Sequence, residues 1–115
     1  MNAQTPSDET PEVALDLIYV AIGEVNPLLP TGEEITPGPA TPLAKPEGPL
    51  DSLGLVNLIV AVEGKVQGAW GRSAGLMEAL EIPAERSPFR TVETLRRFLV
   101  EGAPAGGAGA PGTRP

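Results

Sequence analysis

Apolar and polar positions alternate at helical spacing in three parts of the chain. The first is "PEVALDLIYVAIGEV", residues 11–25. It follows Thr10, a residue type that caps helices, and it opens with Pro11, whose missing N–H costs nothing at the first helical position. We expect a helix over residues 11–25 with a broad buried face that includes Val13, Leu17, Val20, Ala21 and Val25.

Residues 26–50 break this pattern with seven prolines in 25 positions. So many prolines exclude a continuous helix and a central strand, and therefore predict a long loop. A loop of this length in a compact domain is usually functional or anchored by its own apolar side chains. The candidate anchors are Leu28, Leu29, Ile35 and Leu43.

The second periodic stretch, "SLGLVNLIVAVEGKVQ", predicts a helix from about Ser52 to Gln67, ended by Gly68. A projection at about 100° per residue gives it two apolar faces. One is a stripe expected in the core: Leu55, Leu58, Ile59, Val62 and Val66. The other is a smaller patch, in line with Ser52 and Glu63, formed by Leu53, Val56 and Val60.

A helix in a small bundle seldom buries two apolar faces. The patch of Leu53, Val56 and Val60 is therefore either covered, by the long loop or by the region of Trp70, or exposed for a partner. Both alternatives are open from the sequence, and we expect exposure close to Ser52.

The last third of the chain predicts two more helices. A short one, in residues 73–82, would be capped by Ser73 and would stop before Pro83. The final helix starts after the N-cap Thr91 and ends at Gly102. Its expected inner face contains Val92, Leu95, Phe98 and Leu99.

Together these elements predict an all-α, four-helix bundle with three longer helices, one short helix and a long loop between the first two. The domain would span residues 10–101. Residues 1–9 are expected to form a flexible N-terminus. Residues 102–115, rich in Gly, Ala and Pro, are expected to be a disordered tail.

The composition excludes several kinds of chemistry. The 115 residues contain neither cysteine nor histidine, so disulfides, thiolate metal sites and histidine acid–base catalysis are absent. No metal site is expected, and we expect the protein not to be an enzyme. The start of the chain has no signal-peptide pattern, and no segment reaches the roughly 20 apolar residues of a membrane span. The expected location is therefore the cytoplasm.

The net charge of −7 is confined to the first half of the chain. Residues 1–50 carry eight acids and one base, whereas residues 51–115 carry seven of each. An acidic chain with a pI near 4.4 repels phosphate backbones, so we expect no nucleic-acid partner and no membrane partner. Solubility alone is a sufficient reason for the acidity.

Ser52 has two structural interpretations. It could be the N-cap of its helix, or it could lie in the first turn behind an Asp51 cap. The missing histidine base argues strongly against a third interpretation, a small hydrolase with Ser52 as nucleophile, and nothing suggests a pair of Ser52 with Lys45 or Lys65.

The stretch "PLDSLGLVNLIVAVEGKV" and the final "SPFRTVETLRRFL" resemble an acyl carrier protein, and the resemblance covers about residues 8–101. It implies that Ser52 carries 4′-phosphopantetheine, with Asp51 and Leu53 read by the phosphopantetheinyl transferase that moves this arm from coenzyme A. Acyl or aminoacyl groups would then travel as thioesters on the thiol of the arm. The expected partners are that transferase, a loading ligase and downstream acyl-processing enzymes.

The resemblance also gives the second face a role, because such carriers dock through the corresponding positions. Here these are Leu53, Val56 and Val60, with Glu63 beside them. Gly54, Asn57 and Gly64 stand where relatives often carry acids, so docking should depend more on apolar contact, and a specialised biosynthetic pathway is favoured over general fatty-acid synthesis. A monomer is expected. The alternative is a helical protein-interaction module in which Ser52 is only a cap.

Overall fold

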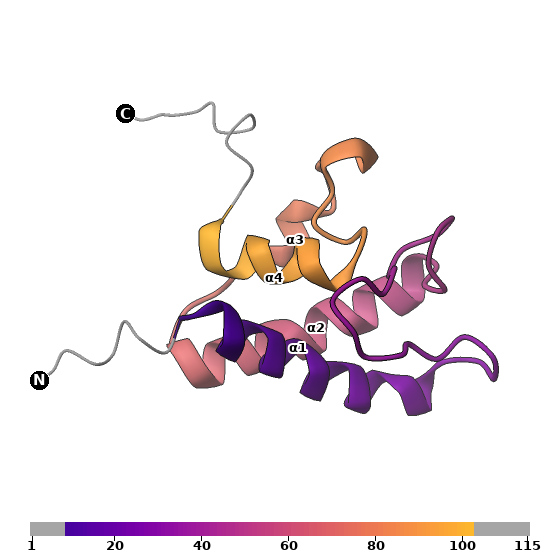
Figure 1. The fold of residues 1–115 in the computed structure, drawn as a ribbon, viewed down its shortest axis with the longest axis horizontal. Coiled ribbons are helices and arrows are strands. Elements are labelled where there is room, and N and C mark those ends of the chain that lie inside the picture. The colour runs from indigo at the N-terminus through magenta and orange to yellow at the C-terminus, as the bar shows by residue number, and fades with distance from the viewer. Residues whose placement is uncertain (1–8, 103–115) are drawn as a thin grey trace, which may run out of the picture.

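A computed structural model describes residues 9–102 of the chain. Its helices are α1 (Pro11–Val25), α2 (Ser52–Trp70), α3 (Leu76–Ala79) and α4 (Val92–Glu101), with 3-10 turns at Asn26–Leu28 and Ala84–Arg86 (Figure 1). The described part is therefore an all-α globule of three longer helices and one short helix, with a long connection between α1 and α2, as predicted. Apart from Glu9 and Gly102, the predicted flexible N-terminus and disordered tail lie outside the described residues.

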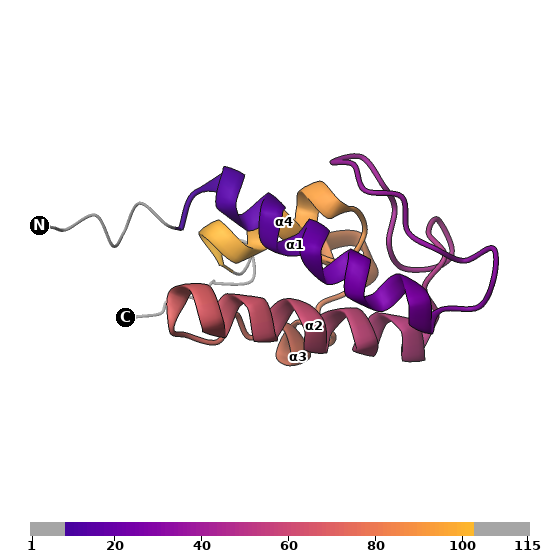
Figure 2. The ribbon, with the colours of Figure 1, turned by 90° about the horizontal axis from the view of Figure 1, so that it is seen from below.

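Helix α1 packs against both α2 and α4, and α3 packs against α2. Helices α1 and α2 run antiparallel, and the long loop gathers at the end of the molecule where α1 ends and α2 begins (Figures 1 and 2). One apolar core joins all four helices with the loop, and every side chain in it is almost fully buried. Its members are Ala14, Ile18, Ala21, Ile22, Val25, Ile35, Leu43, Leu50, Leu58, Ile59, Val62, Val66, Leu76, Ala79, Phe89, Val92, Leu95 and Leu99.

The predicted buried face of α1 was partly wrong. Ala21 and Val25 are buried as expected, but the other buried positions are Ala14, Ile18 and Ile22, and Val20 is 51 % exposed. Most residues of α1 are apolar, so its sequence pattern does not by itself select one buried side. Contact with α2 on one flank and α4 on another selects the buried set.

The ends of α1 and α4 follow the predicted caps. The Thr10 hydroxyl accepts the Val13 N–H at 3.2 Å, and the Thr91 hydroxyl accepts the Thr94 N–H at 3.1 Å. Gly102 ends α4 as expected. Helix α2, in contrast, continues through Gly68 to Trp70 and ends where Gly71 adopts a left-handed φ of 71°. The predicted end at Gly68 was wrong because the left-handed conformation that stops a helix occurs three residues later.

The loop between α1 and α2 is anchored, but not by all the predicted residues. Ile35, Leu43 and Leu50 are buried, whereas Leu28 is 66 % exposed because it lies in the 3-10 turn outside the core. Leu29 is half-buried. The Asn26 side chain donates to the Ile35 carbonyl at 2.9 Å and accepts the Ile35 N–H at 2.7 Å.

The second half of the loop is tied to the segment before α4 by backbone hydrogen bonds. Leu43 N–H donates to the Arg90 carbonyl at 3.0 Å, and Val92 N–H donates to the Thr41 carbonyl at 2.9 Å. The loop is thereby held against the body of the bundle. This support reaches Leu50, the residue directly before the Asp51–Ser52 pair.

Glu9, which the sequence assigned to a flexible N-terminus, takes part in the fold. Arg72 Nη2 contacts Glu9 Oε1 at 2.8 Å and the Leu99 carbonyl at 3.0 Å, and its guanidinium lies 5.1 Å from the Trp70 ring centroid. Hydrogen bonding from Arg72 holds the pKa of Glu9 below its usual range. One arginine after α2 therefore joins the start of α1 to the end of α4.

Within residues 9–102, none of the helices combines the length and the apolar character that crossing a membrane requires.

Candidate functional site

Ser52 is the first residue of α2, and its side chain is exposed. The cap is Asp51, whose Oδ1 accepts the Gly54 N–H at 2.9 Å. Of the two interpretations of Ser52, the structure therefore supports the first-turn position behind an Asp51 cap. Since Asp51 does the capping, the Ser52 hydroxyl has no hydrogen-bond partner among residues 9–102 and faces solvent.

The backbone on either side of Ser52 is held by packing and hydrogen bonds with the long loop. Leu50 is buried, its N–H donates to the Leu43 carbonyl at 2.9 Å, and its carbonyl accepts the Lys45 N–H at 2.9 Å. Gly54 lies against the loop so closely that an added Cβ would come within 3.1 Å of Leu50 Cδ2 and 3.4 Å of Leu29 Cδ2. The first turn of α2 therefore presents an exposed serine on a packed support.

The burial of Gly54 corrects one expectation. The sequence placed Gly54 among docking-face positions where an acid was missing, but this residue faces the loop and the core. Asn57 and Gly64 remain at or near the surface, and Gly64 has open space around it.

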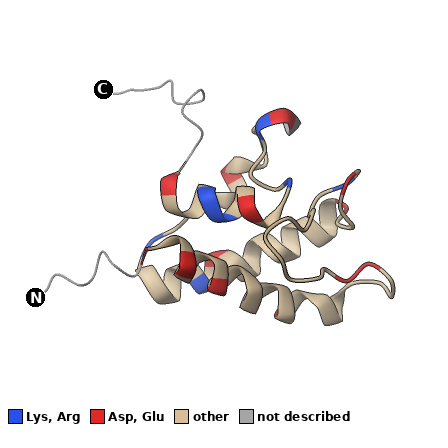
Figure 3. Ribbon diagram, viewed as in Figure 1, with Lys and Arg blue, Asp and Glu red and all other residues tan. Residues whose placement is uncertain are grey.

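The patch of Leu53, Val56 and Val60 is exposed rather than covered. Leu53 is 71 % exposed and Val60 is 63 % exposed, while Val56 between them is half-buried. Helix α2 has only two charged side chains, Glu63 and Lys65, and most of it is tan in Figure 3. Lys65 forms an ion pair with Glu24 of α1. The solvent side of α2 next to Ser52 is thus apolar and uncharged.

Glu63 has a structural role that the sequence did not reveal. Its carboxylate accepts the Ala74 N–H at 2.9 Å and the Leu76 N–H at 2.7 Å, and the Ser73 hydroxyl lies 3.3 Å away. The prediction that Ser73 caps a helix in residues 73–82 was therefore wrong. Helix α3 begins only at Leu76, and residues 73–75 are used to bind Glu63. Glu63 is not a free charge for docking.

The start of α2 fits a phosphate attached to Ser52. The first N–H groups of a helix have no partner inside it, and the helix dipole favours negative charge there. Asp51 occupies the N–H of Gly54, which leaves those of Ser52 and Leu53 at the surface. An exposed hydroxyl beside such groups is suited to a phosphodiester.

A hollow of about 630 Å³ lies beside this turn. It is bounded by Leu55, one turn after Ser52, by the loop around Lys45, and by Leu80, Ile82 and Phe89. The sequence assigned Leu55 to the core stripe, yet it is half-buried and lines this hollow. No local pattern could reveal the hollow, because it is assembled from segments far apart in the chain.

No group of three or more acidic side chains suited to a metal ion occurs in the described part of the chain. Comparison of the whole chain with known proteins found no matching family model, no matching curated protein and no matching solved structure.

Proposed function

We propose that this protein is a discrete carrier that holds acyl or aminoacyl intermediates as thioesters on a 4′-phosphopantetheine arm attached to Ser52. The observation that carries the proposal is the Ser52 hydroxyl itself. It is exposed and has no hydrogen-bond partner in residues 9–102, since Asp51 caps the helix in its place. A serine needed only for capping would bond to its own backbone.

The chain's residues supply the attachment and the arm supplies the chemistry. When bound, the phosphopantetheine group contributes the thiol that forms the thioester, which agrees with a chain that has no cysteine. Ser52 provides the oxygen of the phosphodiester, and the free N–H groups of the first turn favour the phosphate charge. The hollow next to Leu55 offers room for the carried group.

The exposed patch of Leu53, Val56 and Val60 would contact the phosphopantetheinyl transferase, the loading ligase and the acyl-processing enzymes. Because the patch carries no charge and Glu63 is bound internally, recognition would rest on apolar contact rather than on charge steering. This uncharged surface supports a place in a specialised biosynthetic pathway.

The test is the intact mass of the full chain after incubation with coenzyme A and a broad-specificity phosphopantetheinyl transferase. The wild type should gain the mass of one phosphopantetheine group, and Ser52→Ala should gain nothing. Ser73→Ala is the matched control, since Ser73 is also exposed, and it should be modified like the wild type. The proposal fails if several transferases leave the wild type unmodified, or if Ser52→Ala is still modified.

The exposure of Leu53 and Val60 also favours a second candidate, a helical interaction module that uses this patch without any arm. A self-complementary patch would give a stable homodimer and would block access of a transferase to Ser52. Analytical ultracentrifugation discriminates between the two: a carrier sediments as a monomer. A dimer that becomes monomeric in Leu53→Asp would support the module.

A further inference from the structure

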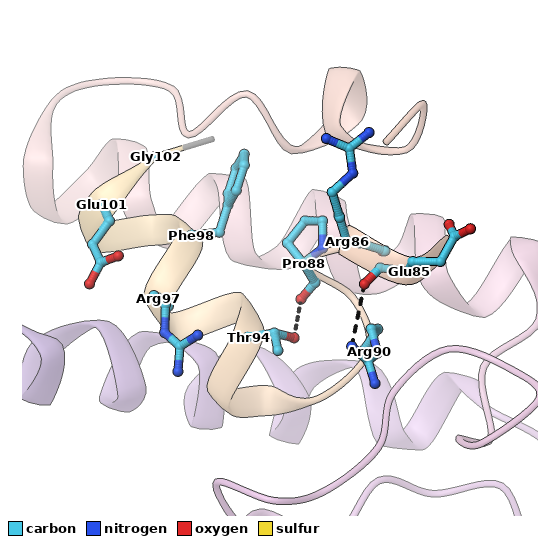
Figure 4. Close-up of a pocket in the computed structure, with 10 residues that line it drawn as sticks. Glu85, Arg86, Pro88, Arg90, Thr94, Arg97, Phe98, Glu101 and Gly102 are labelled. Carbon is cyan, nitrogen blue, oxygen red and sulfur yellow. Dashed lines mark hydrogen bonds between the residues drawn. The ribbon is translucent and has the colours of Figure 1, made fainter. Parts of the chain in front are cut away.

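A second hollow of about 500 Å³ lies on the other side of residues 85–90, between this segment and α4. None of its lining residues belongs to α2, but Glu85, Ser87 and Arg90 line both hollows and form a wall between them. Its size falls within the range of small-molecule pockets, roughly 300–1,000 Å³. Figure 4 shows Phe98 and Pro88 in its middle, with Glu101 and Glu85 at opposite ends.

The walls of this hollow are held in place. The Thr94 hydroxyl donates to the Pro88 carbonyl at 2.8 Å and so joins α4 to the 85–90 segment (Figure 4). The same oxygen accepts the Thr91 N–H at 3.0 Å, as part of the helix cap. Phe89, next to Pro88, is buried in the core. The hollow is thus a preformed feature of the fold rather than a gap between loose loops.

Cationic side chains are concentrated here in a protein whose net charge is −7. Arg86 and Arg90 come from one wall and Arg97 from the other. Arg97 Nη2 lies 3.5 Å from Glu93 Oε2, and the same carboxylate also pairs with Arg96. The Arg90 side chain donates only to the backbone carbonyl of Glu85, at 3.4 Å, and the Arg86 guanidinium has no ion pair or hydrogen bond within residues 9–102.

Three other cations of the fold are neutralised by contrast, although Lys45 is not paired within residues 9–102. Lys65, Arg72 and Arg96 each form an ion pair with a glutamate. The charges of Arg86 and Arg90 are therefore left for something outside the described chain, and the planar guanidinium group is suited to a carboxylate or phosphate.

We propose that this hollow binds a small aromatic carboxylate, with the ring against Phe98 and the carboxylate at Arg86. Figure 4 shows the Arg86 guanidinium on the same side as the Phe98 ring, whereas Arg90 points to the opposite side of the 85–90 segment. The lining holds three arginines and two glutamates, a net of one positive charge, which matches a monoanion better than a dianionic phosphate. The half-buried Phe98 ring provides an apolar wall for a planar group. The site goes beyond the proposed carrier function and does not depend on it.

The experiment is an NMR titration of the ¹⁵N-labelled full chain with benzoate, acetate, benzyl alcohol and inorganic phosphate at low ionic strength. Benzoate should give saturable shifts confined to about residues 85–102, with a Kd on the order of 1 mM. Acetate and benzyl alcohol should each bind at least about tenfold more weakly, because acetate lacks the aromatic ring and benzyl alcohol lacks the carboxylate. Phosphate should also bind more weakly than benzoate.

Arg86→Gln should weaken benzoate binding about tenfold or more, and more than Arg90→Gln does. The side chains of Arg86 and Arg90 are exposed, so the variants should keep the fold. The dispersion of the NMR spectrum of each variant shows whether it is folded. Lys65→Gln is the control for net charge and should change the Kd less than about twofold. The proposal is overturned if benzoate shifts spread over all cationic residues without saturating, if benzyl alcohol or phosphate binds as well as benzoate, or if Lys65→Gln weakens binding as much as Arg86→Gln.

Discussion

The Glu63 carboxylate on α2 accepts the backbone N–H of Leu76, the first residue of α3, at 2.7 Å. The same side chain accepts the N–H of Ala74 at 2.9 Å. A glutamate on the exposed half of one helix thus supplies acceptors for the backbone that leads into the next. This contact explains how α3, only four residues long, keeps its position against α2.

Replacing this carboxylate should loosen α3. Glu63→Gln puts an NH₂ group where one accepting oxygen was, so one backbone N–H loses its partner. We expect a loss of about 1–3 kcal/mol in the free energy of unfolding. Urea denaturation followed by circular dichroism measures it. Glu81→Gln, at an exposed glutamate, is the control and should change stability by less than about 0.5 kcal/mol. Equal values for the two variants would contradict an internal role for Glu63.

The ion pair between Glu9 and Arg72 makes stability depend on pH. Arg72 lowers the pKa of Glu9 in the folded state. The pair therefore stabilises the fold fully above the unfolded pKa, about 4.3, and this contribution is lost as the pH falls through the lower folded pKa.

The variant Glu9→Gln should melt at a lower temperature than the wild type at neutral pH. The two melting curves should converge in acid, where Glu9 is protonated in both folded and unfolded chains. The pKa of Glu93 is also lowered, chiefly by hydrogen bonding from Arg96, but this pair is present in both proteins and cancels in the comparison. Both partners of the Glu9–Arg72 pair are over a third exposed, so salt should reduce the difference. A difference that stays constant from neutral to acid pH would exclude this ion pair as its cause.

Two glycines should respond to alanine in opposite directions. A Cβ on Gly48 would lie 2.4 Å from the carbonyl carbon of Leu43, and this backbone cannot move without breaking the turn that supports Leu50. Gly48→Ala should cost about 1–3 kcal/mol or more. Gly64 lies inside α2 with nothing within 4 Å, so Gly64→Ala should stabilise by roughly 0.5–1 kcal/mol. Denaturation midpoints at an unchanged m value measure both effects. Stabilisation by Gly48→Ala would refute the close approach.

Alanine variants of Asp51 and Ser52 should differ in their effect on stability, because only Asp51 caps α2. Asp51→Ala removes the cap of α2 and should cost about 0.5–2 kcal/mol. Ser52→Ala removes an exposed hydroxyl with no partner in the described chain, and it should change stability by less than about 0.5 kcal/mol. Thermal unfolding of both variants provides the measurement. A large loss in Ser52→Ala would mean that Ser52, not Asp51, holds the helix start.

The sequence predicted what depends on short-range interactions. The Thr10 and Thr91 caps, the end of α4 at Gly102 and the exposure of Leu53 near Ser52 follow from residues within about one turn of each other. The same local chemistry left Asp51 and Ser52 as alternative caps, and only the structure assigns the role to Asp51.

By itself, then, the sequence determined an all-α chain with the starts of its three longer helices and with Ser52 at the head of α2. Only the tertiary structure decided which side of α1 is buried, that Leu28 stays outside while Leu50 goes in, and that Gly54 packs against the loop. It also decided that Glu63 binds the start of α3 and that Arg86, Arg90 and Arg97 line one hollow. The physical reason is the range of the interactions. A cap is set by neighbours in the chain, whereas a buried face, a backbone acceptor and a pocket depend on segments that only packing brings together.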